Sequence, residues 1–152
     1  MTHKVHTLRR ENSVEDAINL MAMEDIGAIP IIDDDSHVVG ILTDRDIVVR
    51  CFYNKHPLVT TVEEYMTTNV CTLYEDEEVG TIVSTMSQLQ IKRIPIVDKD
   101  NKLAGIISLG DLATNTQTDA KSAEALRNIS MPNSSDFGSN PNYDNKVDNF
   151  PL

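Results

Sequence analysis

The segment AIPIIDDDSHVVGILTDRD, residues 28–46, recurs 65 residues later as RIPIVDKDNKLAGIISLGD, residues 93–111. The same offset holds without a gap from the first residue to residue 113, and 16 of the 48 aligned pairs are identical. A fixed period of this kind indicates copies of one supersecondary unit. Two copies are too few for a solenoid. We therefore expect them to pack face to face about a pseudo-twofold axis, which would place two related clefts between them.

Each copy has the pattern of a mixed α/β unit with the order β-α-β-β-α. Apolar residues at helical spacing follow Ser13, which we expect to cap the first helix with Asp16 as its capping-box partner. Gly27 is expected to end that helix, and Thr43 to cap the second one. The predicted strands are 5–8, 28–32 and 38–42 in the first copy and 70–73, 94–97 and 103–107 in the second; the predicted helices are 13–27 and 43–53, then 79–90 and 108–113.

The chain length of 152 residues suits one body made from both copies. Each copy of about 65 residues would be marginal alone, so we expect mutual burial. The boundaries that follow are 1–62 for the first repeat and 63–128 for the second. Residues 129–152, rich in Asn, Ser, Pro and Asp, are expected to form a largely disordered tail.

Composition excludes several partners. The net charge of −11 argues against nucleic acids and against anionic membrane surfaces. No apolar run is long enough to span a membrane or to serve as a signal segment, so we expect a cytoplasmic protein. The two cysteines are expected to be reduced. The four histidines lack metal-ligand spacing, and the acidic residues 33–35 are expected to form a solvated turn, so no metal site is predicted.

The most informative chemistry lies at the strand-to-helix corners. Thr43 and Ser108 each place a hydroxyl where a helix begins, and Asp46 and Asp111 follow three residues later. The first amides of a helix favour an anion, and a carboxylate one turn further can accept from the two hydroxyls of a ribose. These features describe a ribose-phosphate site. The same spacing is also that of a variant capping box, so both interpretations stay open.

The two repeated segments resemble the tandem cystathionine-beta-synthase (CBS) domain pair, also called a Bateman module. The resemblance covers about residues 1–115. It implies two βαββα units packed through their sheets, with clefts for AMP, ADP, ATP or S-adenosylmethionine as a regulatory ligand rather than a required cofactor. It also implies a homodimer that signals to a separate effector protein, which the sequence does not identify.

Residue roles follow from this resemblance. Asp46 and Asp111 would bind ribose, Thr43 and Ser108 would bind phosphate or ribose, and the remaining residues would border the base or phosphate. The second cleft would comprise Val70, Thr72, Lys92, Arg93, Ile94, Pro95, Ser108 and Asp111. The first would comprise Val5, Thr7, Ala28, Ile29, Pro30, Thr43, Arg45 and Asp46.

The two clefts are expected to differ chemically. Arg93 suits a phosphate, but its counterpart in the first repeat is Ala28. Arg45 is the residue of the first repeat that could supply this cation, although its own counterpart is Gly110. We therefore expect a phosphorylated nucleotide in the second cleft, and a weaker, empty or less charged site in the first.

Three function classes follow from the sequence. The first is a stand-alone adenosine-ligand sensor, and the second is a dimeric scaffold whose clefts no longer bind ligands. The third, an enzyme, is disfavoured because no nucleophile and base are paired at the repeated corner.

Overall fold

The computed structural model of the chain describes residues 1–115 and 127–130. The mixed α/β class predicted from the repeat is confirmed. The first repeat contains α1 (Val14–Glu24), β1 (Ala28–Ile32), β2 (Val38–Thr43), α2 (Asp44–Asp46), the π-helix η1 (Ile47–Phe52) and the 3₁₀ turn η2 (Val62–Glu64). The second contains β3 (Leu73–Tyr74), α3 (Val79–Leu89), β4 (Arg93–Val97), β5 (Leu103–Ser108) and α4 (Leu109–Asn115).

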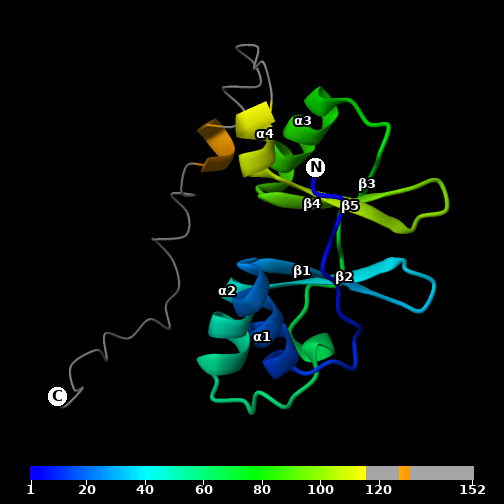
Figure 1. Cartoon of the computed structure of the whole chain (residues 1–152). Helices are drawn as coiled ribbons and strands as arrows, with labels where there is room; N and C mark the ends of the chain where they lie inside the picture. The colour runs from blue at the N-terminus through cyan, green and yellow to red at the C-terminus, as the bar shows by residue number, and fades with distance from the viewer. Residues whose placement is uncertain (116–126, 131–152) are drawn as a thin grey trace.

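The two sheets face each other in the middle of the molecule, and the helices lie on the outer sides (Figure 1). In one sheet β1 pairs antiparallel with β2, and in the other β4 pairs antiparallel with β5, while β3 lies parallel to β4. The two hairpins keep the same register, because Ala28 opposes Thr43 where Arg93 opposes Ser108. The repeat in the sequence is thus a repeat in three dimensions.

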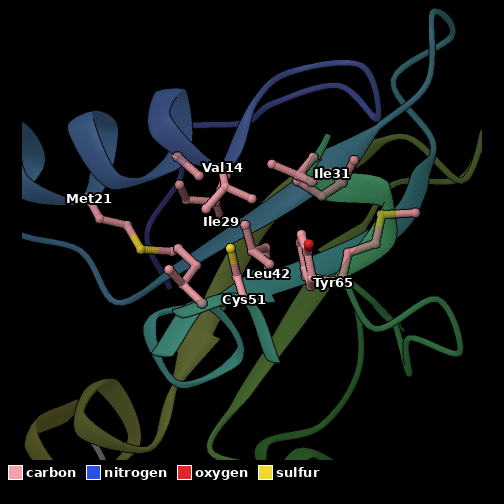
Figure 2. Packing of buried hydrophobic residues seen from close by; sticks show 11 residues of the cluster. Val14, Met21, Ile29, Ile31, Leu42, Cys51 and Tyr65 are labelled. Atoms are coloured by element: carbon pink, nitrogen blue, oxygen red, sulfur yellow. The ribbon is translucent and has the colours of Figure 1, made fainter. Parts of the chain in front are cut away.

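Each sheet packs its helices through an aliphatic core. The central strands β1 and β4 are almost wholly buried, as expected for strands covered on both faces. Figure 2 shows the core of the first repeat, where Val14 and Met21 of α1 meet Ile29, Ile31 and Leu42 of the sheet. The second core is built from Ile82, Val83, Met86, Ile94, Ile96, Leu112 and Ile129.

Ile129 corrects the predicted start of the tail. Its side chain is 3% exposed and belongs to the second core, and residues 127–130 are helical. Residue 129 is therefore packed against the second repeat, although the sequence analysis assigned it to the tail. The rest of the predicted tail, 131–152, lies outside the described residues.

The first residues of each repeat, 2–8 and 67–73, cross from one sheet to the other. Thr2 exchanges two backbone hydrogen bonds of 3.0 Å with Ile106 on β5, whereas Leu8 pairs with Ile31 on β1. The first residues of the second repeat make the reverse crossing. Thr67 pairs with Ile41 on β2 of the first sheet, whereas Leu73 belongs to β3 of the second sheet. The predicted strands 5–8 and 70–73 are therefore wrong in extent, because most of their residues lie between two sheets rather than along one.

The ends of the helices also differ from the prediction. The capping box of Ser13 and Asp16 is present, but α1 ends at Asp25 in the left-handed conformation (φ 53°) and not at Gly27. Helix α3 ends in the same way at Gln90 (φ 54°). The expected helix 43–53 is a single α-turn followed by the π-helix η1.

The acidic residues 33–35 form the hairpin turn predicted for them. Asp33 Oδ1 accepts from the backbone amides of Asp35 (3.0 Å) and His37 (2.8 Å). Asp98 accepts in the same way in the second hairpin, from Asp100 and Lys102. Carboxylates that hydrogen-bond their own backbone in this way are typical of turns.

Candidate functional site

Both strand-to-helix corners have the same internal geometry. Asp111 Oδ2 accepts from the Ser108 amide (2.8 Å) and from the Ser108 hydroxyl (2.7 Å), while Ser108 Oγ accepts from the Asp111 amide (3.1 Å). Thr43 and Asp46 repeat these bonds at 2.9, 2.6 and 3.2 Å. The corners are thus reciprocal capping boxes, and this geometry fixes the direction in which each carboxylate points.

The hydrogen bonds at the second corner also set the charge of its carboxylate. The Ser108 hydroxyl, and after it the Ser108 amide, lower the pKa of Asp111 below the ordinary 3.8, against the opposite effect of burial. Hydrogen bonds to the charged form favour that form. Asp111 is consequently an anion at neutral pH, and an ionised carboxylate accepts hydrogen bonds but donates none.

A cavity of about 250 Å³ opens beside this corner, between the two repeats. The crossing segment of the first repeat forms one wall, the end of α1 and the start of β1 form another, and the second repeat supplies the third. The lining residues are Thr2, Lys4, Val5, His6, Asp25, Ile26, Gly27, Ala28, Arg93, Ile106, Ser108 and Asp111.

The cavity groups the predicted residues differently from the sequence analysis. Arg93, Ser108 and Asp111, assigned to one cleft, line it together, and they are joined by Val5 and Ala28, which were assigned to the other cleft. The crossing of the first segment explains this exchange. The predicted residues that do not line this cavity are Thr7, Ile29, Pro30, Thr43, Arg45 and Asp46 from the first set and Val70, Thr72, Lys92, Ile94 and Pro95 from the second.

Four of the expected wall residues belong to the interior instead. Ile29 and Ile94 are 0% exposed, and Pro30 and Pro95 are also fully buried. They lie in the central strands, whose side chains fill the core below the corners. Their role is to hold the strand from which the corner projects.

Sequence reasoning missed seven lining residues. Thr2, Lys4 and His6 come from the crossing segment, Asp25, Ile26 and Gly27 from the loop after α1, and Ile106 from β5. Only the pairing of the first residues with the second repeat brings the first three here. No local motif marks them.

Gly27 is needed here for close approach rather than for a helix end. A methyl group at this position would lie 3.0 Å from Asp44 Oδ2 and 3.5 Å from Arg93 Nη2. The Gly27 carbonyl also accepts from the Asp44 amide (3.2 Å). The missing side chain therefore leaves room for the Asp44 carboxylate, which a Cβ would crowd, whereas the distance to the Arg93 guanidinium is an ordinary contact.

The charges around the cavity are mixed and favour a ligand with an anionic end and a polar, hydroxyl-bearing end. Lys4, His6 and Arg93 supply cationic or titratable groups, while Asp25 and Asp111 supply carboxylates. His6 also lies 3.2 Å from Glu24 through Nε2. In a chain of net charge −11, this local group of basic side chains is a distinct feature.

The residues that the structure describes hold neither a candidate metal cluster nor a membrane-spanning helix. Among residues 1–115 and 127–130, no three His, Cys, Asp or Glu side chains gather as a metal site would require. Within the same residues, every helix is too short or too polar to span a lipid bilayer.

Comparison with known proteins identifies the class of this fold. The sequence matches the CBS domain family over residues 1–52 and again over 62–116. The chain therefore belongs to the CBS domain family, and it carries two copies of the domain.

Its relatives include small proteins of the same extent. The CBS domain-containing protein YhcV of Bacillus subtilis is 37% identical over 133 residues, which cover 88% of this chain and 94% of that protein. The solved CBS domain pair of protein MJ0100, in complex with 5′-methylthioadenosine and S-adenosyl-L-methionine, is 31% identical with a TM-score of 0.64, covering 73% of this chain and 87% of that one. CBSX2 in complex with AMP is 26% identical with a TM-score of 0.67, covering 75% and 90%.

Proposed function

We propose that this chain is a regulatory module that binds a phosphorylated adenosine compound in the cavity beside Asp111 and reports its presence to a separate protein. The observation that carries the proposal is the convergence of Arg93, Ser108 and Asp111 on one cavity built from both repeats. Similar domain pairs are solved with AMP and with S-adenosyl-L-methionine. A ligand that contacts both repeats would favour one relative packing of them, which is how occupancy becomes a signal.

Each part of the ligand has a matching group in this proposal. The Asp111 carboxylate accepts from the ribose hydroxyls, and Arg93 takes the phosphate. The Ser108 hydroxyl joins Arg93 at the phosphate by turning its hydrogen away from Asp111 Oδ2. Val5, Ala28 and Ile106 offer apolar surface to the base. We assign AMP, ADP or ATP to this cavity before S-adenosylmethionine, because the sulfonium of the latter would meet the Arg93 guanidinium.

Replacing Arg93 by glutamine is the direct test of this assignment. We expect the variant to bind AMP about tenfold more weakly, because a hydrogen bond to a charged group contributes about 1.5 kcal/mol. Its affinity for adenosine, which has no phosphate, should change less than twofold. Isothermal titration of both ligands into both proteins measures this difference. Equal losses for AMP and adenosine would remove Arg93 from the phosphate site, and no binding of any adenosyl compound to the wild type would reject the proposed function.

We also propose a homodimer formed through the outer face of the first repeat. An apolar groove there is lined by Ile18, Met21, Ala22, Asp44, Ile47, Val48, Phe52 and Leu58, and the Phe52 side chain is 71% exposed. Exposed apolar surface of this kind marks an interaction site.

We expect Phe52→Glu to raise the dimer dissociation constant at least tenfold, as measured by light scattering over a dilution series. An unchanged dimer, or a monomeric wild type, would contradict this interface.

We propose that the module has no catalytic activity, acts in the cytoplasm, and binds neither nucleic acid nor membranes. The negative charge supports the absence of nucleic-acid and membrane binding, and the free cysteines Cys51 and Cys71 support the cytoplasm.

The alternative is a dimeric scaffold without a ligand. It is favoured by the capping boxes, since hydrogen bonds within each corner give its carboxylate a structural role in the absence of any ligand.

A further inference from the structure

The first corner makes a contact that the shared capping geometry does not include. Arg50, one turn after Asp46, directs its Nε to Asp46 Oδ1 at 3.4 Å. The other carboxylate oxygen, Oδ2, accepts from the amide and the hydroxyl of Thr43. Both oxygens of Asp46 therefore face donors from the protein itself.

A second bond of Arg50 holds the guanidinium in this position. Its Nη1 donates to the backbone carbonyl of Tyr65 at 2.9 Å. Tyr65 is 4% exposed, and its hydroxyl lies 2.7 Å from His56 Nδ1. Arg50 thus bridges a corner of the first repeat to a buried residue of the connection between the repeats. A guanidinium fixed at two points keeps its geometry better than one held by a single exposed ion pair.

The second repeat cannot form this bridge. Four residues after Asp111, where the first repeat has Arg50, the chain has Asn115. Asparagine carries no positive charge, so residue 115 cannot pair with Asp111 as Arg50 pairs with Asp46. The cavity found in the structure lies at this second corner and includes neither Thr43 nor Asp46.

We propose that Arg50 is a positioning residue that keeps the first corner engaged with the protein, so that the chain binds one equivalent of an adenosyl ligand instead of two. This inference rests on the proposed function of the second corner. A ribose diol entering the first corner would have to displace the guanidinium from Asp46 before it could donate to both oxygens. The duplicated sequence therefore contains two corners of one design, of which one is a ligand site and the other a structural joint.

The test is the stoichiometry of AMP binding measured by isothermal titration. The wild type should bind one equivalent, and Arg50→Asn, which copies the second repeat, should bind two. Arg50→Lys is the matched control, because it keeps a cation within reach of Asp46, and it should stay at one. Arg50→Gln, which retains a donor for the Tyr65 carbonyl without the charge, should behave like Arg50→Asn and covers the case in which the asparagine variant does not fold.

The same Arg50 change made in the Asp111→Ala variant separates ligand binding at the first corner from a general destabilisation of the fold. Asp111→Ala alone should bind AMP at least tenfold more weakly than the wild type. Adding Arg50→Asn to this variant should restore the binding of one equivalent. Adding Asp46→Ala as a third change should abolish that binding again. Two equivalents on the wild type, or one equivalent on both Arg50→Asn and Arg50→Gln, would overturn this inference and leave the proposed function intact. A wild type that binds no adenosyl ligand would reject both.

Discussion

Replacing Asp111 by alanine will weaken AMP binding by roughly 100-fold. The change removes the carboxylate that we assign to the two ribose hydroxyls. Hydrogen bonds to a charged group contribute about 1.5–3 kcal/mol each. A loss of about 2.7 kcal/mol corresponds to a factor of 100 in affinity. The lowered pKa of Asp111 means that the wild-type carboxylate is fully ionised throughout the neutral range, so the loss should be the same at pH 6 and at pH 8. Isothermal titration at both pH values measures it.

The matched control for this change is Asp46→Ala. Asp46 makes the same capping box with Thr43 that Asp111 makes with Ser108, so the two variants lose similar helix-end contacts. We expect Asp46→Ala to lower stability by about 1 kcal/mol, the usual contribution of a cap, and to change AMP affinity less than twofold. If both variants lost affinity equally, the asymmetry of the two corners would be disproved. If neither did, Asp111 would not be the ribose acceptor.

Replacing Gly40 by alanine will lower the free energy of unfolding by about 2 kcal/mol, because overpacking a filled interior costs about 1–3 kcal/mol. A Cβ at this position of β2 would lie 2.4 Å from Met66 Sδ, 3.1 Å from its Cγ and 3.2 Å from its Cε. Met66 is 6% exposed and leads into the crossing segment of the second repeat, so it has little room to move. Urea denaturation of the two proteins gives the difference.

Alanine substitutions at two other glycines serve as comparisons for Gly40→Ala. Gly105 is the counterpart of Gly40, and its Cβ would lie 2.5 Å from Met1 Sδ and 3.0 Å from the Thr2 carbonyl oxygen. Met1 is 37% exposed and can turn away, but the Thr2 carbonyl is held by its hydrogen bond with Ile106, so Gly105→Ala should also destabilise the protein. Gly80, in α3, has no atom within 4 Å of such a group, so Gly80→Ala should stabilise the protein by about 0.5–1 kcal/mol. A Gly40→Ala protein as stable as the wild type would contradict the tight contact between the repeats.

The architecture was predictable because the repeat and the apolar patterns give the same answer. Residues 28–32 form the buried strand expected from their continuous apolar run, and Ser13 caps α1 as its spacing with Asp16 indicates. The end of α1 was not predictable, since Asp25 takes the left-handed conformation two residues before the glycine that favours it. Local preference is weak there compared with the packing that fixes the loop.

The corner was likewise predictable, but its surroundings were not. The spacing of Ser108 and Asp111 reveals a hydroxyl beside a carboxylate, whichever role they have. A repeat shows which residues are equivalent, yet it does not show which copy they contact. Val5 could have stood beside either corner under the same pseudo-twofold symmetry, and the hydrogen bonds of Thr2 with Ile106 decide the matter. Such pairing between distant segments leaves no trace in a short stretch of sequence.

The exchange of first segments between the repeats has a consequence for a chain that is still being synthesised. A ribosome releases the N-terminus first, but Thr2 has no partner until Ile106 has emerged, and the last wall of the cavity, Asp111, follows five residues later. Domains that fold during translation normally complete themselves in order. Here residue 2 must wait for residue 106, so a translation product interrupted before residue 111 lacks a wall of the cavity that we assign to the ligand.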